Sequence, residues 1–399
     1  MTKGISVAGL GVISAIGNSV SDCLSSFQQE KGGIDDIMYL KTVHQNKIPV
    51  AEVKLSNQQL AEYAGLPSNL PRIVLLSTIA ANEALKNAGI SNWKSWRTGI
   101  ISANTIGGMD KSESFYADFL DNNYTGKLRE VVHHECGSAT ELLANILGIK
   151  NHVSTISTAC SSSANALFSA ARLIKNDVLD IVVAGGVDAL TKFTMNGFNT
   201  LMILDGDYCK PFDDNRNGLN LGEGAGYVVL VSDKVAATLD NRPFCKLSGY
   251  CNANDAYHQT ASSPDGTGSY LAMTGAMNLS GINPSDIDYI NLHGTGTQNN
   301  DNSEGRAIAR IFKDKYPRMS STKSFTGHTL GASGSIEAVF SVLAIRDGIV
   351  YPNLRFHTPM KDIEIVPQTS FLNGENIKHV LSNSFGFGGN CTSLVFSKI

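Results

Sequence analysis

The sequence predicts an α/β protein built from two related halves, and two observations support this. Short runs rich in β-branched residues alternate with longer amphipathic stretches along all 399 residues. In addition, residues 161–169 align without gaps with residues 333–341. Each segment has a small-residue turn followed by a helix with the same apolar phase. We therefore expect two copies of one α/β unit, at 1–240 and 241–399, that pack as one body; a chance similarity of two small-residue helix starts is the alternative.

Helices are predicted where apolar residues recur every three to four positions, at 73–88, 139–147, 164–175, 270–279, 302–312 and 336–347. Strands are predicted in short apolar runs, at 5–10, 99–103, 153–156, 181–184, 225–231, 287–292 and 394–396. The first run follows Lys3, but Gly9 and Gly11 interrupt it and no convincing cleavage site follows. We interpret it as a buried strand rather than a signal peptide.

Composition excludes several classes of function. The formal net charge is −4 and no Lys/Arg run is present, which argues against a nucleic-acid-binding protein. The seven cysteines are scattered and contain no C-x-x-C pair, so we expect reduced thiols and a cytoplasmic location. No apolar run approaches the roughly 18 residues that a spanning helix needs, so we expect a soluble protein without a membrane partner.

The most informative motif is Thr158-Ala159-Cys160-Ser161-Ser162-Ser163. It lies between the predicted strand at 153–156 and the predicted helix at 164–175, which places the Cys160 thiol at the first turn of a helix. Unpaired N–H groups and the positive end of the helix dipole favour the nucleophilic thiolate there. A buried structural cysteine is the alternative for this residue taken alone.

Two histidines lie in motifs of the second half. His293 ends a predicted strand and opens the loop His293-Gly294-Thr295-Gly296-Thr297, a position that faces a cleft in many α/β proteins. His328 lies just before the helix of the second repeat, so the duplication would bring it towards Cys160. Lys323, five residues earlier, could supply a fixed positive charge. A turn histidine, a capping histidine and a solvated lysine are the alternatives.

A glycine-rich loop near the C-terminus could complete such a site. The stretch Asn383-Ser384-Phe385-Gly386-Phe387-Gly388-Gly389 could offer an N–H group to an oxyanion and a movable apolar gate. A buried strand with a glycine bulge is the alternative.

Two weaker patterns carry no function. Gly9, Gly11 and Gly17 imitate part of a dinucleotide fingerprint, but the third glycine is misplaced and the acidic residue is missing. Residues 133–136 are His-His-Glu-Cys, but neighbouring positions on one element rarely converge, so we expect no metal site.

Four motifs in order identify a family resemblance: Thr-Ala-Cys-Ser-Ser-Ser, His-Gly-Thr-Gly-Thr, Lys-Ser-x-Thr-Gly-His and Gly-Phe-Gly-Gly. They resemble the elongating β-ketoacyl-acyl-carrier-protein synthases of fatty acid and polyketide synthesis, and the resemblance extends over nearly the whole chain. It implies the thiolase fold, in which two duplicated α/β halves pack as a five-layered αβαβα body.

The resemblance also implies a two-step condensation. Cys160 would accept an acyl chain as a thioester, with the N–H groups of Cys160 and Phe387 holding the oxyanion. His293 and His328 would hydrogen-bond the thioester carbonyl of malonyl-carrier protein while carbon dioxide leaves. The product would be a β-ketoacyl chain two carbons longer.

Supporting residues follow from the same resemblance. Lys323 would orient His328, with Glu337 as the partner of the lysine, and Asp301 and Glu304 would organise the network. The phosphopantetheine arm would contact hydroxyl groups, those of Thr295, Thr297 and, as a weaker candidate, Thr260. Ile106 would swing aside for long acyl chains. No tightly bound cofactor is expected, because the substrates arrive on the phosphopantetheine of acyl-carrier protein.

Expected partners are an acidic acyl-carrier protein and a second subunit. A basic patch of Lys210, Lys127 and Arg129 would meet the carrier. We expect a homodimer; a heterodimer with a chain-length factor is the alternative. His133 and His134 fall where a partner subunit of such enzymes contributes apolar residues, which argues against an ordinary long saturated acyl chain.

Other readings remain. A thiolase-like enzyme would act on coenzyme A thioesters and use a second cysteine near the C-terminus, for which Cys391 is the candidate. A non-catalytic chain-length partner would lack Cys160. One departure has no explanation in the sequence: Asn390-Cys391 stands where Thr-Asn is usual in the family.

Overall fold

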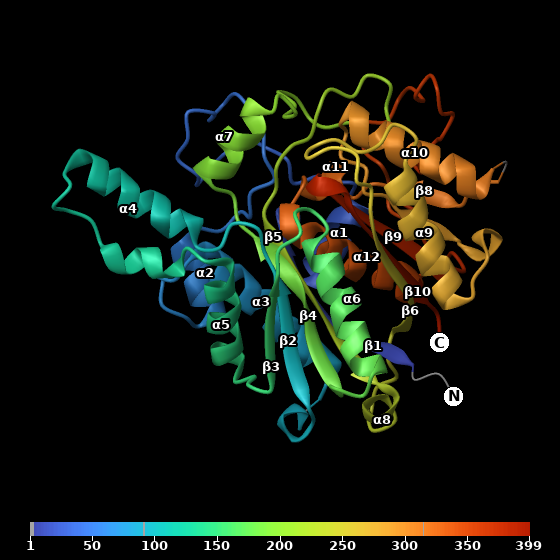
Figure 1. Ribbon diagram of the computed structural model, residues 1–399, viewed down its shortest axis with the longest axis horizontal. Helices are drawn as coiled ribbons and strands as arrows, with labels where there is room; N and C mark the ends of the chain where they lie inside the picture. The colour runs from blue at the N-terminus through green and yellow to red at the C-terminus, as the bar shows by residue number, and fades with distance from the viewer. Residues whose placement is uncertain (1–3, 91, 314) are drawn as a thin grey trace.

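The computed structural model describes residues 4–90, 92–313 and 315–399 (Figure 1). The strands are β1 (Ile5–Ser14), β2 (Thr98–Ala103), β3 (His152–Ile156), β4 (Ile181–Asp188), β5 (Gly224–Ser232), β6 (Cys245–Asn254), β7 (Tyr289–Asn291), β8 (Arg318–Ser320), β9 (His379–Gly386) and β10 (Asn390–Ser397). The α-helices are α1 (Val20–Gln28), α2 (Asn57–Ala64), α3 (Arg72–Ala88), α4 (Met109–Asp121), α5 (Cys136–Leu147), α6 (Ser162–Lys175), α7 (Lys192–Thr200), α8 (Asp233–Ala236), α9 (Thr267–Ser280), α10 (Gln298–Phe312), α11 (Lys323–Thr326) and α12 (Ser333–Asp347). Short 3₁₀ turns are η1 (Trp93–Ser95), η2 (Leu128–His133), η3 (Pro284–Asp286), η4 (Leu330–Ala332) and η5 (Phe387–Gly389).

The strand order shows the duplication. The described strands join in the order β3-β2-β4-β5-β1-β6-β10-β9-β7-β8. From the centre outwards, each half has the same sequence of strand pairings: two antiparallel pairs followed by two parallel pairs. The order is β1-β5-β4-β2-β3 in the first half and β6-β10-β9-β7-β8 in the second. The halves meet at β1 and β6, through the antiparallel pairs Ser6 with Lys246 and Val7 with Cys245. The predicted boundary near residue 240 falls between α8 and β6.

Helices α6 and α12 form the middle layer of the molecule. Each packs against strands of both halves, α6 on β4 and β10 and α12 on β5 and β9. Helices α3 and α5 cover the outer face of the first half, and α9 packs on the outer face of the second with α10 against it. This arrangement is the predicted αβαβα layering. The apolar faces of these helices bury one large cluster between the two halves of the sheet and one under each outer layer.

Small residues let the two central helices meet closely. A Cβ atom on Gly334 would lie only 2.8 Å from the Cβ of Ala164, so the helix starts touch through their backbones. The N–H of Ser335 donates to Oγ of Ser163 over 2.9 Å. The internal repeat aligns these two serines, so equivalent positions of the two halves meet across the centre.

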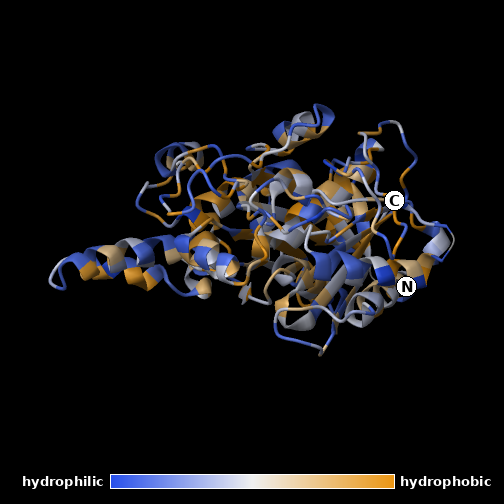
Figure 2. Cartoon of the chain, turned by 90° about the horizontal axis from the view of Figure 1, so that it is seen from above, coloured by the Kyte–Doolittle hydropathy of each residue, from blue (hydrophilic) through white to orange (hydrophobic). Residues whose placement is uncertain are grey.

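The predicted helices and strands are confirmed, with ends that coincide or extend by up to four residues, except that the strand predicted at 287–292 is shorter, at Tyr289–Asn291. The sequence analysis missed β6, in which Lys246, Ser248 and Asn252 interrupt the apolar pattern, and the three-residue strand β8. It also missed α4, which projects with η2 as an arm away from the body (Figures 1 and 2). Within the described ranges, the helices are too short or too polar to cross a bilayer.

Candidate active site

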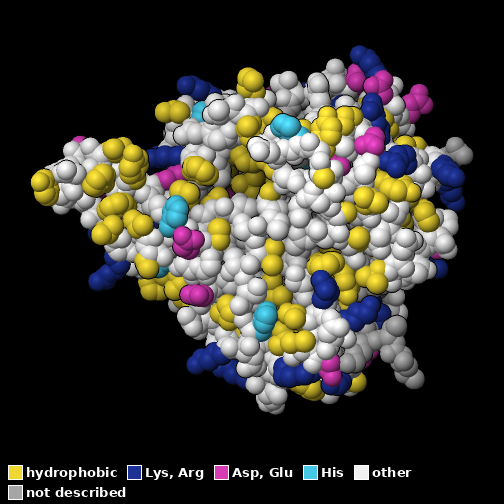
Figure 3. All heavy atoms as spheres, viewed as in Figure 1, with side chains coloured by type: hydrophobic (Ala, Val, Ile, Leu, Met, Phe, Trp, Pro, Cys, Tyr) yellow, Lys and Arg dark blue, Asp and Glu magenta, His cyan; other side chains and the backbone are white. Residues whose placement is uncertain are grey.

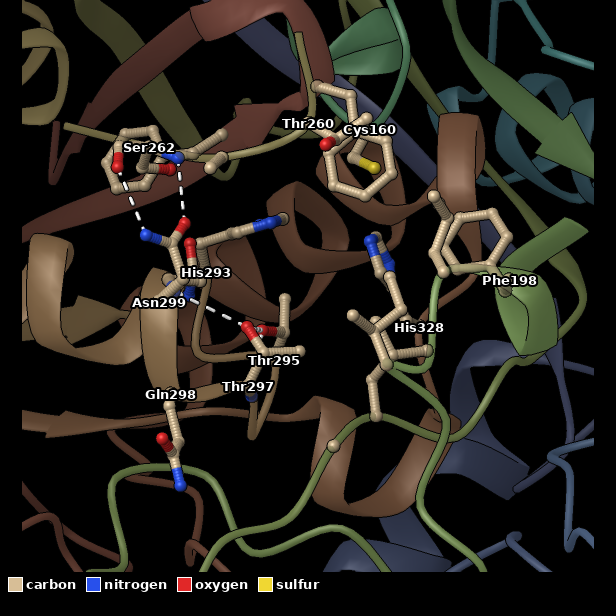
Figure 4. Close-up of a pocket in the computed structure, with 18 of the residues that line it drawn as sticks. Cys160, Phe198, Thr260, Ser262, His293, Thr295, Thr297, Gln298, Asn299 and His328 are labelled. Atoms are coloured by element: carbon tan, nitrogen blue, oxygen red, sulfur yellow. Dashed lines mark hydrogen bonds between the residues drawn. The ribbon is translucent and has the colours of Figure 1, made fainter. Parts of the chain in front are cut away.

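A cavity of about 380 Å³ gathers the three residues that the motifs singled out (Figure 4). Cys160 comes from the turn before α6, His293 from the loop after β7, and His328 from the turn between α11 and η4. The sulfur and the two imidazole rings point into the same space. Phe387 and the three threonines at positions 260, 295 and 297 also line it.

Cys160 sits on a sharp backbone turn. Ala159 before it has a φ of 52°, in the left-handed region, and Ser161 after it leads into α6. The charge of Lys323 and the N–H groups of Phe387 and Cys160 act to lower the pKa of the thiol. Burial outweighs them and raises the pKa of Cys160 to about 11. The expectation of a favoured thiolate is therefore wrong for the resting site.

Lys323 determines which nitrogen of His293 faces the cavity. Its Nζ lies 3.3 Å from Nδ1 of His293 and also pairs with the carboxylate of Glu337. Since an ammonium group only donates, Nδ1 accepts and the ring proton is on Nε2. Burial and the nearby lysine hold the pKa of His293 well below its usual range, so the ring is neutral.

The predicted contact between Lys323 and His328 is wrong. Lys323 begins α11 behind the His293 loop, whereas the chain turns at Gly327, with a φ of 63°, before it reaches His328. Nδ1 of His328 lies 3.0 Å from Oγ of Ser333 instead. Burial lowers the pKa of His328 as well, with the charge of Lys323 adding to the effect. The two rings are nearly perpendicular, with centroids 5.4 Å apart.

Two buried carboxylates hold the loop that carries His293. Glu304 accepts the N–H groups of His293 and Gly294 at 2.9 and 2.8 Å, and burial raises its pKa to about 7. Asp301 accepts the N–H of Thr295 at 3.0 Å and that of Phe212 at 2.8 Å. This is the organising role that the resemblance implied for both acids. The sequence analysis did not find Asn383, whose Nδ2 donates to Glu304 over 3.0 Å.

Hydroxyl groups and aromatic rings form the walls of the cavity. The Oγ1 atoms of Thr295 and Thr297 are 2.9 Å apart, and Thr260 lies on another wall of the cavity (Figure 4). The ring of Phe387 stacks on Phe198 of α7, with centroids 5.9 Å apart and planes 17° apart. Sequence reasoning missed Phe198 because a single phenylalanine in a polar helix gives no signal of its partner.

Several predicted residues lie elsewhere. Among the described residues, those that line the cavity do not include Ile106, which is buried with the core of the first half. Lys210 is 3.6 Å from Asp207, next to the turn at Gly296. The rest of the predicted basic patch, Lys127 and Arg129, lies on or beside η2 of the projecting arm, as do His133 and His134.

Cys391 is not a second thiol of this cavity. It is buried against Ala272 and Phe385, and among the described residues it is not part of the lining. Burial raises its pKa to about 12. The geometry therefore gives no support to a two-cysteine thiolase site.

Comparison with known proteins places the chain in a family. Residues 2–236 match the family described as the N-terminal domain of β-ketoacyl synthase, and residues 244–357 match its C-terminal domain. A 3-oxoacyl-[acyl-carrier-protein] synthase 2 of Staphylococcus aureus strain N315 is 33% identical over 409 residues, covering 99% of this chain and 98% of the relative.

Solved structures agree. The ishigamide ketosynthase/chain length factor superposes with a TM-score of 0.93 at 26% identity over 100% of both chains. A ketosynthase from Xenorhabdus doucetiae, solved in complex with its chain length factor, gives 0.85 at 28% identity over 100% of this chain and 98% of the other. A buried cysteine and two neutral histidines in one cavity, on a duplicated αβαβα body with these relatives, establish that the chain belongs to the β-ketoacyl synthase family of condensing enzymes.

Proposed function

We propose that this chain condenses a malonyl unit on acyl-carrier protein with an acyl chain held on Cys160, in fatty acid or specialised polyketide or polyene synthesis. The observation that carries the proposal is the convergence of the Cys160 sulfur, two N–H donors and two neutral imidazoles on one cavity. A protein that only binds a ligand does not need a thiol that is flanked by N–H donors and neutral imidazoles.

In the first half-reaction, the sulfur of Cys160 attacks the acyl thioester of the carrier. The carbonyl oxygen becomes an oxyanion, and the N–H groups of Cys160 and Phe387, which act on the thiol and lower its pKa, are the donors that would hold it. Because the pKa of the thiol is about 11, Cys160 is neutral at rest and has to lose its proton as the sulfur attacks. Its proton leaves with the phosphopantetheine thiol, so the acyl-enzyme forms without net charge.

In the second half-reaction, malonyl-carrier protein loses carbon dioxide and a carbanion forms next to its thioester carbonyl. The Nε2–H of His293 is available to hold that oxygen, since Lys323 occupies Nδ1. His328 supplies the second donor from the facing wall. The carbanion attacks the acyl carbon and Cys160 departs as a thiolate, which takes one proton from water. Neutral rings suit this step, because they donate without a permanent charge in the cavity.

Substrate delivery follows from the shape of the cavity. Thr295, Thr297 and Thr260 present hydroxyl groups along its walls, where the phosphopantetheine arm would pass. The substrates arrive attached to acyl-carrier protein, so the enzyme needs no tightly bound cofactor. Lys210, near this loop, is the best placed of the predicted basic residues to meet an acidic carrier.

We further propose that a second chain covers the projecting arm. All 13 residues of α4 are at least partly exposed. Figure 3 shows apolar side chains along the arm, which carries the exposed residues Tyr116, Phe119, Leu120, Tyr124, Leu128 and Val132. A monomer would leave this surface in water. A homodimer is the first expectation and a heterodimer with a related chain the second, and sedimentation of the purified chain distinguishes a self-associating protein from one that needs a partner.

Intact-protein mass spectrometry tests the proposed reaction. The protein is incubated with a panel of acyl-carrier proteins that carry different acyl groups, with Cys160→Ala as the control. A mass gain in wild type alone, followed by a β-ketoacyl product when malonyl-carrier protein is added, supports the proposal. Acylation by coenzyme A thioesters but by no carrier would contradict it.

A further inference from the structure

An amide network links the Phe387 loop to the turn that holds Cys160. Asn390 is the first residue of β10, directly after the glycines of η5. Its Oδ1 accepts three hydrogen bonds, from Oγ of Ser161 at 2.7 Å, Nδ2 of Asn165 at 2.8 Å and Nδ2 of Asn252 at 2.8 Å. Through these three hydrogen bonds, the side chain of Asn390 holds the start of β10 against the start of α6 and against β6.

The network continues around Asn165, which is buried on the first turn of α6. Its Nδ2 also donates to Oγ1 of Thr158 over 2.9 Å, and its Oδ1 accepts Oγ1 of Thr392 at 2.7 Å. Thr158 and Ser161 lie on either side of Cys160 in the chain. The same amide group therefore holds both flanks of the nucleophile.

The backbones come close at the same place. A Cβ atom on Gly386 would lie 3.1 Å from the backbone nitrogen of Cys160. Between this contact and Asn390 lies only the short loop 387–389, in which Gly388 and Gly389 adopt φ values of 78° and 77°. The loop is tied on one side by the N–H of Gly388, which donates to the Gln259 carbonyl at 2.7 Å, and by the Gly389 carbonyl, which accepts the N–H of Asp255 at 2.8 Å. Neither of these bonds reaches the Cys160 turn, so the tie from the loop to that turn comes from its two ends.

We infer that Asn390 is a positioning residue that sets the Phe387 N–H against the Cys160 N–H. This rests on the proposed acyl transfer to Cys160. The two N–H groups stabilise an oxyanion only when their separation is fixed. The side-chain carbonyl of Asn390 ties β10, which follows the Phe387 loop, to the start of α6, which follows Cys160.

Two substitutions separate this role from a general structural one. Asn390→Leu keeps the size but removes the acceptor. Asn390→Asp keeps an oxygen that can accept all three bonds. Asn176→Leu is the matched control, because Asn176 is an exposed amide at the other end of α6.

The experiment compares two reactions of Cys160 in the full-length protein. Acylation by p-nitrophenyl acetate passes through an oxyanion and needs no carrier protein, whereas alkylation by iodoacetamide forms none. Asn390→Leu should slow acylation by about 10²-fold, the lower end of the cost of one oxyanion donor, and alkylation by less than about tenfold. Asn390→Asp should recover most of the acylation rate, and Asn176→Leu should leave both rates unchanged.

Other outcomes overturn the inference. Acylation and alkylation that fall together would mean that Asn390 merely supports the helix, and an Asn390→Asp variant as slow as Asn390→Leu would mean that the acceptor is not what matters. Because neither reagent requires a carrier protein, these results stand apart from the mass-spectrometric test of the proposed function.

Discussion

Nζ of Lys323 lies 3.3 Å from Nδ1 of His293 and pairs with Glu337 on its other side. Both the lysine and the glutamate are buried, so this charge pair is held away from water. Burial raises the pKa of Glu337 to about 7, while the charge of Lys323 acts to lower it. One ammonium group thus fixes the tautomer of His293 and helps to keep both cavity histidines neutral.

Replacing Lys323 by Met should release His293 from this tautomer. Without the donor at Nδ1 and without the positive charge, the pKa values of His293 and His328 should rise, so both rings should protonate at a higher pH than in wild type. Nitrogen NMR of labelled histidines reports tautomer and titration together. Decarboxylation should fall by up to about 10²–10³-fold. Lys361→Met, which alters an exposed lysine, is the control. Unchanged His293 resonances would contradict the assignment.

Cys160 should titrate as a buried thiol. Its resting form is neutral because its pKa is about 11, and the small thiolate fraction is what reacts with iodoacetamide, so the alkylation rate should rise about tenfold per pH unit up to pH 10. The rate should be lower in Lys323→Met at every pH, since the lysine lowers the pKa of the thiol. Peptide mapping separates Cys160 from the half-exposed Cys136 and Cys251. A plateau near pH 8 would show that the thiolate is already favoured.

Removing a histidine should separate the two half-reactions. His328→Ala should lower carbon dioxide release from malonyl-carrier protein by about 10²–10³-fold, because one of two donors to the developing charge is lost. Acyl transfer to Cys160 should persist, since its oxyanion donors are backbone N–H groups. His134→Ala, on the projecting arm, should change neither rate. Equal losses in both half-reactions would instead place His328 in the first step.

The helices, the strands and the three central residues could be predicted because their signals are local, whereas the five-layered arrangement was expected from the family resemblance. Helix periodicity, a cysteine at a helix start and a histidine at a strand end depend on neighbours in the chain. The repeat added one long-range expectation, that His328 lies towards Cys160, and both residues line the same cavity. It could do so because a duplicated chain places equivalent turns together.

The contacts that could not be predicted from the sequence depend on where side chains point in the folded protein. Lys323 is closer in the chain to His328 than to His293, yet its side chain passes behind the His293 loop to reach Glu337. Phe198 and Asn390 acquire their roles from partners almost 190 and 230 positions away, Phe387 and Ser161. The pKa of Cys160 follows from burial, which a helix-start motif does not reveal.

The buried ion pair between Arg72 and Glu223 should be a major contributor to stability. Three of their side-chain contacts are shorter than 3.2 Å, and Glu223 also accepts the N–H groups of Val53 and Leu190. Arg72→Met leaves this carboxylate without its charge partner, which should lower the free energy of unfolding in urea by about 3–5 kcal/mol. Lys361→Met, at an exposed pair, should leave the urea midpoint unchanged. A loss no larger than that of the control would mean that the carboxylate is satisfied by its N–H donors alone.

The stack of Phe387 on Phe198 should act as a latch on the loop that supplies an oxyanion donor. Phe198 lies on α7 and packs against a small outlying cluster, so its loss should loosen the Phe387 ring while leaving the large central cluster intact. A stacked pair contributes about 0.5–1.5 kcal/mol, and Phe198→Ala should therefore raise the population of the open loop about two- to tenfold.

The measurement is the rate of Cys160 alkylation by N-phenylmaleimide relative to that by iodoacetamide. This ratio should rise in Phe198→Ala because only the bulky reagent needs the loop to move. In Phe193→Ala, an exposed position on the same helix, it should stay at the wild-type value. A ratio that rises equally in both variants would locate the effect in α7 as a whole, and one that rises in neither would show that the Phe387 loop opens without breaking the stack.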